Sequence, residues 1–113
     1  MDILVREYIR EDGSSPYTDW FNGLDPYTAA KVTTATVRLG LGNTSNLKRI
    51  AGGISEYVIN WGPGYRIYLA REGKDLIILF GGGTKRRQQR DIVTAIALRS
   101  EYRARKQKNR KKR

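Results

Sequence analysis

The residues best suited to chemistry lie in one stretch of the chain, from Gly62 to Asp91. Within it, a run of three glycines is followed by four cations in a six-residue window: Lys85, Arg86, Arg87 and Arg90. Arg66 precedes them in a strand-like segment. Cations bind phosphate oxygens, and guanidinium groups do so with two parallel hydrogen bonds. The stretch therefore indicates a phosphate-binding site with a carboxylate, Asp91, beside it.

Composition restricts what such a site can do. The 113 residues include no cysteine and no histidine, which excludes cysteine nucleophiles, zinc fingers and histidine acid–base catalysis. The sequence has neither a P-loop nor a metal-ligand pattern, so no metal and no other cofactor is expected. RNA, however, can be cleaved by attack of its own 2′-hydroxyl, without a protein nucleophile. Preorganised cations would then stabilise the transition state, by about 3–4 kcal/mol per group.

The candidate catalytic residues are Arg66, Lys85, Arg86 and Asp91. For two of these residues, the alternative to a catalytic role is a purely structural one. Arg66 either contacts phosphate or forms a salt bridge with Glu56 across a sheet. Asp91 either takes part in the reaction beside the cations, or is a first-turn carboxylate favoured by the helix dipole, or forms an ion pair with Arg87 or Arg90.

A further set is expected to bind RNA or the ribosome, and it comprises Lys48, Arg49, Tyr68, Arg87 and Arg90. Strand alternation places Tyr68 on the same face as Arg66, where the tyrosine ring would stack on a base. Lys48 and Arg49 come just ahead of a strand. They either contact a nucleic-acid backbone or are solvated surface residues.

Periodicity predicts the elements that position these residues. Alternating or continuous apolar runs predict strands over residues 3–9, 54–61, 65–70 and 76–80. Ser15-Pro16 and Asp25-Pro26 are helix-start signals and predict helices over about 16–24 and 27–39. A last helix is predicted from 88 to about 105. The order β-α-α-β-β-β-α predicts one α+β domain over residues 1–102, with both N-terminal helices laid against the sheet.

Charge is concentrated at the C-terminus. The net charge is +11, but residues 103–113 hold eight of the 22 basic residues and no acid, which leaves +3 for residues 1–102. This basic tail is expected to be solvated or frayed, and to order on a polyanion. It is either a solubility extension or a nucleic-acid- or ribosome-binding segment. No apolar run suits a signal peptide or membrane span, so a cytoplasmic location without a membrane partner is expected.

Several segments together resemble the toxins of type II toxin–antitoxin modules in the RelE/ParE superfamily, in particular the phage-derived Gp49-like, HigB-like addiction module killer branch. These segments are Leu47-Lys48, Gly53-Ile54-Ser55-Glu56, GPGYRIY from Gly62, GGGTK from Gly81 and Gln89-Arg90-Asp91-Ile92. The resemblance covers residues 1 to about 102. It implies two N-terminal helices on a mostly antiparallel sheet, and a cytoplasmic toxin neutralised by a small antitoxin, often a helix-turn-helix HigA-like protein.

The resemblance implies two different activities. RelE- and HigB-like members are metal-independent endoribonucleases that cut mRNA in the ribosomal A site, which predicts a ribosome-dependent mRNA interferase in contact with mRNA and rRNA. ParE-like members poison DNA gyrase instead, and the lack of a histidine or tyrosine near Asp91 keeps this alternative open. A third alternative is a non-enzymatic RNA- or ribosome-binding module that depends on the basic tail.

Overall fold

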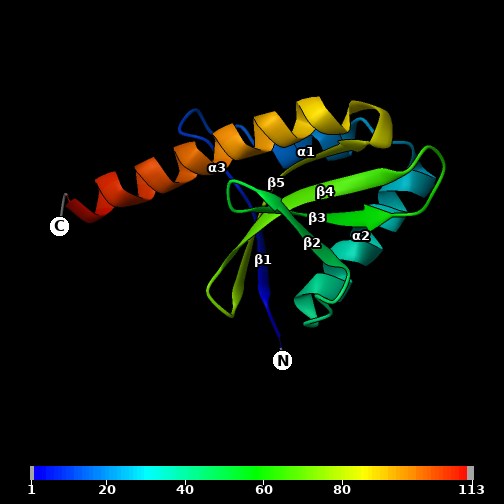
Figure 1. Cartoon of the computed structure of the whole chain (residues 1–113), viewed down its shortest axis with the longest axis horizontal. Helices are drawn as coiled ribbons and strands as arrows, with labels where there is room; N and C mark the ends of the chain where they lie inside the picture. Colours follow the sequence, from blue (N-terminus) through cyan, green and yellow to red (C-terminus); the bar gives the residue numbers. More distant parts are fainter. Residues whose placement is uncertain (1, 112–113) are drawn as a thin grey trace.

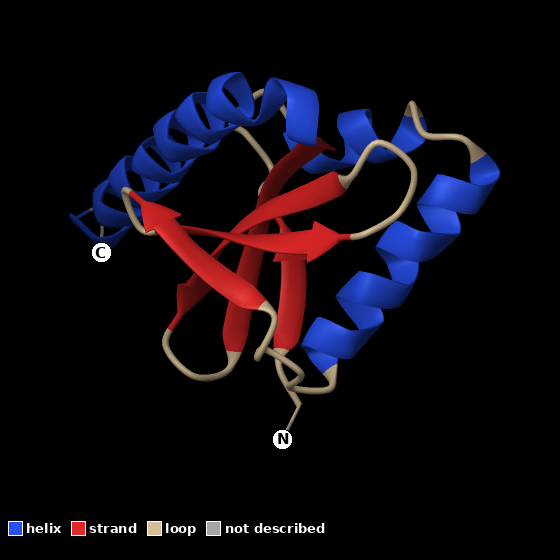
Figure 2. Ribbon diagram, turned by 45° about the vertical axis from the view of Figure 1, so that its right-hand side comes forward, coloured by secondary structure: helices blue, strands red, loops and turns tan. Residues whose placement is uncertain are grey.

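Five strands form one sheet with helices on both of its faces (Figures 1 and 2). The computed structural model describes residues 2–111. Its elements are β1 (Leu4–Glu7), α1 (Pro16–Asn22), α2 (Pro26–Gly40), β2 (Leu47–Ala51), β3 (Ile54–Ile59), β4 (Tyr65–Glu72), β5 (Leu76–Thr84), the 3₁₀ turn η1 (Lys85–Arg87) and α3 (Gln88–Lys111). The strand order is β1-β5-β4-β3-β2, and every pair is antiparallel except β1 with β5. The predicted α+β fold with a mostly antiparallel sheet is confirmed.

The predicted order lacks one strand, β2, which the structure adds before β3. β2 pairs antiparallel with β3, with Lys48 opposite Glu56. The register shifts between Arg49 and Ala51, which indicates a bulge. A bulge breaks the period of two on which strand prediction depends, and an edge strand with two cations has no apolar run to signal it.

Strand β5 continues past Phe80, where the sequence predicts its end. The three glycines extend the strand to Thr84, and Gly83 pairs with Arg66 of β4. A side chain at Gly82 would overlap the ring of Trp20, and one at Gly83 would overlap the carboxylate of Asp91. These glycines therefore let α1 and α3 approach opposite faces of the same strand.

Helices α1 and α2 cover one face of the sheet and begin at their predicted caps. The Ser15 hydroxyl accepts a hydrogen bond from the Thr18 amide at 3.1 Å, and Asp25 accepts one from the Thr28 amide at 2.9 Å. Both helices start with proline. The core on this face consists of Tyr17, Val32, Ala35, Leu39, Tyr57, Ile67, Leu69, Ile77 and Leu79.

Helix α3 covers the other face, over a second core made by Tyr8, Ile54, Tyr68, Ala70, Ile78, Phe80, Ala95 and Leu98. It ends at Lys111 rather than near Arg105, so the described part of the basic tail is helical and not frayed (Figure 1). The guanidinium of Arg105 attaches this half of α3 to the segment that follows β1, because it donates to the Ile9 carbonyl at 2.7 Å. Residues 112 and 113 lie outside the described residues. No helix within residues 2–111 is long and apolar enough to cross a membrane.

Candidate active site

The predicted catalytic residues converge where β4 and β5 meet the first turn of α3. The Lys85 amide donates to the Gly64 carbonyl at 3.0 Å, which joins η1 to the turn before β4. A Cβ built on Gly64 would lie 3.6 Å from Lys85 Cβ and 3.8 Å from Arg66 Nη1. Asp91 lies over Gly83, the partner of Arg66 across the ladder. The structure therefore brings Arg66, Lys85 and Asp91 together.

Arg66 forms the salt bridge with Glu56 that its structural alternative predicts. Its Nε lies 3.3 Å from Glu56 Oε2, and the two side chains are 11% and 3% exposed. The Gln88 side chain, from α3, also donates to Oε2 at 3.2 Å. Within the described residues, Arg66 Nε and Nη1 are buried and have no hydrogen-bond partner. The guanidinium is thus fixed by Glu56 as a largely buried positive charge beneath the exposed cations.

Asp91 is a carboxylate with unusual surroundings. Its Oδ2 is buried and has no hydrogen-bond partner among residues 2–111, and Asp91 forms no salt bridge within this range. Burial raises the pKa of Asp91, and the charges of Arg87 and Arg90 offset only part of that increase. A carboxylate with a raised pKa is a stronger base than free aspartate, which suits proton transfer.

Tyr68 is a core residue, so its predicted role in stacking on a base is wrong. The residue is 1% exposed and packs in the core beneath α3. Its hydroxyl has no hydrogen-bond partner among the described residues, and burial, with the nearby charges of Glu56 and Asp91, raises its pKa to about 12. Tyr68 and Asp91 line a cavity of about 110 Å³ together with Trp20 of α1. The prediction failed because strand alternation identifies a face but not whether a helix covers it.

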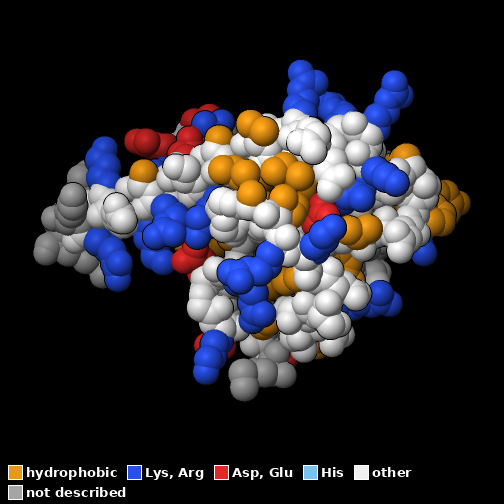
Figure 3. All heavy atoms as spheres, viewed as in Figure 1, with side chains coloured by type: hydrophobic (Ala, Val, Ile, Leu, Met, Phe, Trp, Pro, Cys, Tyr) orange, Lys and Arg blue, Asp and Glu red, His pale blue; other side chains and the backbone are white. Residues whose placement is uncertain are grey.

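The predicted cations differ in exposure and in the face of the sheet on which they lie. Lys85, Arg86, Arg87 and Arg90 are exposed, and Figure 3 shows basic side chains projecting around the N-terminal end of α3. Lys48 pairs directly with Glu56, so it lies on the same face of the sheet. Arg49 pairs with Ser55 and points to the other face. We use the name Asp91 cluster for Asp91 and six cations from β2, β4, η1 and the start of α3: Lys48, Arg66, Lys85, Arg86, Arg87 and Arg90.

Sequence reasoning named Arg49 and the basic tail as candidates for nucleic-acid binding but did not group them with Arg71 and Arg99. Arg49 and Arg71 point to the face of α1 and α2, and the depression that they line runs past the strand turns to α3, where Arg99, Arg103 and Arg110 complete it; we call it the arginine groove. Three of these arginines are on α3, at residues 99, 103 and 110, which is a helical spacing that the sequence does display. The two strand residues join them only through the tertiary fold.

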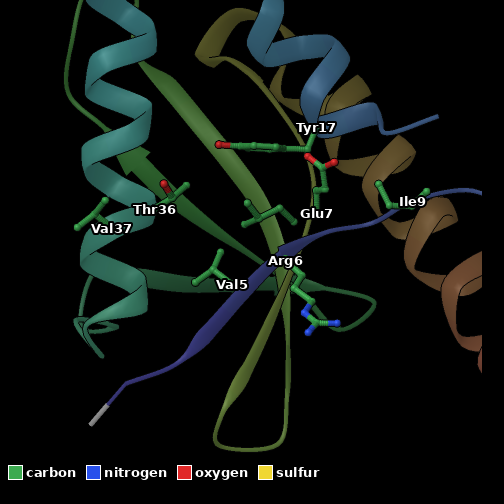
Figure 4. Close-up of a pocket in the computed structure, with 8 residues that line it drawn as sticks. Val5, Arg6, Glu7, Ile9, Tyr17, Thr36 and Val37 are labelled. Atoms are coloured by element: carbon green, nitrogen blue, oxygen red, sulfur yellow. The ribbon is translucent and has the colours of Figure 1, made fainter. Parts of the chain in front are cut away.

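A third concave region lies on the opposite face, beside the edge strand β1 (Figure 4). It measures about 590 Å³ and is lined by Val5, Arg6, Glu7, Ile9, Tyr17, Thr36, Val37 and Leu79. Glu7, one of the two charged residues there, already accepts a hydrogen bond from the Thr18 hydroxyl. This groove therefore lacks the convergent acid, base and cations of the Asp91 cluster.

Fold and site together define a small α+β protein with a cationic site around a partly buried carboxyl group. The chain is 37% identical over 86 residues to a protein of Haemophilus influenzae described as uncharacterized, and the match covers 75% of this chain and 87% of that relative. The chain therefore belongs to the same protein family as this relative. No family model matches the sequence, and no solved structure matches it significantly.

Proposed function

We propose that this protein is the toxin of a type II toxin–antitoxin module in the RelE/ParE superfamily, acting in the cytoplasm as a ribosome-dependent mRNA endonuclease. The observation that carries the proposal is the Asp91 cluster, in which a carboxyl group with a raised pKa lies among cations. The sequence segments that resemble this superfamily provide five of the cluster's residues: Lys48, Arg66, Lys85, Arg90 and Asp91.

The proposed reaction uses the substrate's own nucleophile. The 2′-oxygen bonds to phosphorus while the bond from phosphorus to the 5′-oxygen breaks, which leaves a 2′,3′-cyclic phosphate and a 5′-hydroxyl. Asp91 takes the proton from the 2′-hydroxyl, and water supplies a proton to the departing 5′-oxygen. The exposed Lys85 stabilises the charge that develops on the phosphoryl oxygens, with the Arg66 guanidinium behind it as a fixed positive charge. No metal takes part in this scheme.

Primer extension on mRNA in a translating extract tests the proposal. Asp91→Asn and Lys85→Gln are the informative variants, because Arg66→Ala would also remove a buried salt bridge. We expect cuts within the reading frame only when ribosomes are engaged, and about a hundred-fold weaker cleavage by Asp91→Asn, as for loss of a general base. Arg38→Gln, an exposed change on α2, is the matched control for Lys85→Gln.

Two outcomes would contradict the proposal. Full cleavage by Asp91→Asn would remove Asp91 from the reaction. The absence of cuts from folded protein would reject the endonuclease. In that case, inhibition of DNA supercoiling would assign a ParE-like gyrase poison, whereas ribosome binding that is lost on removal of residues 103–113 would assign a binding module.

The proposed partner is a cognate antitoxin, a small helix-turn-helix protein. An acidic segment of that partner would cover the exposed cations at residues 85–90, because carboxylates substitute for phosphate at such a surface. Hydrogen–deuterium exchange on the co-expressed pair tests this surface. Protection of residues 85–90 is expected, while protection confined to α1 and α2 would mean that the antitoxin binds the opposite face and blocks access to the ribosome sterically.

A further inference from the structure

We infer that the arginine groove is a second nucleic-acid site, which binds the phosphodiester backbone of a folded RNA or a DNA duplex. This inference goes beyond the proposed cleavage, because the groove contains none of the residues of the Asp91 cluster. It holds whether or not the Asp91 cluster cuts RNA. The shape of the groove, the fixed positions of two of its arginines and its uncompensated charge support this inference.

The groove is continuous across two elements of structure. It consists of two adjoining hollows of about 510 and 200 Å³, which share Arg71 and Arg99. On the α3 wall, Arg99, Arg103 and Arg110 follow one face of the helix, about 6 and 10 Å apart along its axis at 1.5 Å per residue. Figure 3 shows basic side chains gathered below the C-terminal half of α3 and over the adjacent end of the sheet. Such a row can contact successive phosphates along a strand.

Two of the guanidinium groups are held in place by the fold. Arg99 Nη1 donates to the Gly52 carbonyl at 3.1 Å, and the side chain occupies the space where Gly53 would carry a Cβ. Arg71 Nη2 donates to the Lys74 carbonyl in the β4–β5 turn at 3.2 Å. Both groups retain further N–H donors. Fixing the cations in advance reduces the entropy lost when a ligand binds.

The charge of the groove is not compensated by acids. Glu72 is the one acid among the described residues that line it, and its carboxylate already pairs with Lys106 at 3.4 Å. None of the five arginines forms a salt bridge within residues 2–111. The five guanidinium groups of the groove are therefore not neutralised by acids within the described residues.

The larger hollow includes Leu47, Ile50, Ala51 and Ile54 in its lining, but the lining of the smaller hollow favours nucleic acid over an acidic protein segment. None of the eight residues that line the hollow between α3 and the β4–β5 turn has an apolar side chain. Protein partners bind through buried apolar or aromatic anchors, with charges at the rim. A phosphate backbone, by contrast, is bound by cations alone, and arginine is well suited to its oxygens.

The groove is also separate from the Asp91 cluster. Helix α3 connects the two basic regions, and it places the half-buried Ile92 and Ile96 between them. Figure 3 shows hydrophobic side chains between the two regions on this face. From Arg90 to Arg99, the first groove residue on α3, the helix rises about 14 Å. A ligand in the groove can therefore remain bound while the Asp91 cluster is free.

Fluorescence anisotropy with a labelled RNA hairpin and a DNA duplex of the same sequence, measured over a range of salt concentrations, tests the inference. The groove variant is Arg103→Gln with Arg110→Gln, two exposed positions on α3. Its matched control is Lys31→Gln with Arg38→Gln, which removes the same charge from α2 on the opposite face. Full-length protein is used throughout, and the RNA hairpin is presented without ribosomes.

We expect the groove variant to bind on the order of ten-fold more weakly than the control. The slope of log affinity against log salt should fall by about 1.8 on the duplex, because each lost phosphate contact contributes about 0.9. A larger loss on the hairpin than on the duplex would identify RNA as the natural ligand, and the reverse would identify DNA.

Two results would overturn the inference. Equal losses in the groove and control variants would mean that net charge alone governs binding. Unchanged nucleic-acid binding with reduced binding of a poly-glutamate peptide would assign the groove to an acidic protein. Neither result depends on cleavage, so failure of the endonuclease proposal and failure of this inference are distinguishable.

Discussion

The two basic regions at the ends of α3 differ in what lies beneath their cations. In the Asp91 cluster, Glu56 and Arg66 are buried as a pair, and Asp91 places an unpartnered oxygen against Gly83. In the arginine groove, the acid is Glu72, which is partly exposed and paired with Lys106. Burial shifts acid–base equilibria and fixes geometry, whereas exposed charge only attracts anions. The first region is therefore suited to chemistry and the second to binding.

The same difference predicts how substitutions in each region affect the stability of the fold. Substitutions in the Asp91 cluster should change both stability and activity, because its central side chains are part of the core beneath α3. Substitutions of Arg103 and Arg110 in the arginine groove should change affinity while leaving stability nearly untouched, since exposed side chains contribute little. Four measurements test this contrast.

The largest expected effect is on the buried pair. Arg66→Ala should lower the free energy of unfolding by about 3 kcal/mol, because it leaves the Glu56 carboxylate buried without its counter-charge. Arg103→Gln, in the groove, should cost less than about 0.5 kcal/mol. Urea unfolding of both variants measures the difference. Similar small losses for both would mean that the Asp91 cluster is as solvated as the groove.

The contact between Gly83 and Asp91 can be tested by coupling two substitutions. Gly83→Ala should destabilise the protein by about 2 kcal/mol, since the added methyl group overlaps the Asp91 carboxylate. In an Asp91→Ala background the same change should cost much less. A double-mutant cycle by thermal unfolding measures this coupling. Additive losses would place the carboxylate elsewhere.

The raised pKa of Asp91 predicts a pH effect. The folded state holds this proton more tightly than the unfolded state, so stability is lost as pH rises from the unfolded pKa, near 4, through the folded value. Asp91→Asn should therefore be more stable than the original protein at pH 7, by on the order of 0.5 kcal/mol after solvent screening, and equal to it well below pH 4. Destabilisation at pH 7 would show instead that the attraction of Arg87 and Arg90 for the Asp91 carboxylate outweighs the cost of burying it.

The smallest expected effect concerns Glu72, the acid in the groove. Glu72→Gln removes a partly exposed ion pair with Lys106, so stability should change by less than about 0.5 kcal/mol. Binding of the RNA hairpin should tighten two- to three-fold at low salt, and the gain should disappear at high salt, where such charges are screened. Unchanged affinity at low salt would indicate that phosphate does not approach this wall of the groove.

Local sequence signals determined most of the architecture. Ser15-Pro16 and Asp25-Pro26 specify where two helices begin, because their side chains and rings act on the adjacent backbone. The alternation in 65–70 correctly places Ile67 and Tyr68 on opposite faces of the sheet. The bulged edge strand β2 escaped prediction because its pattern is not periodic.

The tertiary structure alone decided which cations act together and which lie over buried groups. The sequence pattern around Arg66 would be the same whether its side chain faced solvent or Glu56. Only the packing of α3 onto the sheet determines that the Arg66 side chain is buried. The same packing buries Tyr68 and brings Asp91 onto Gly83. Likewise Arg71 and Arg99 line one hollow because two strand turns lie beside the middle of α3. Residue types and spacing describe local chemistry, but burial and long-range proximity are properties of the folded chain.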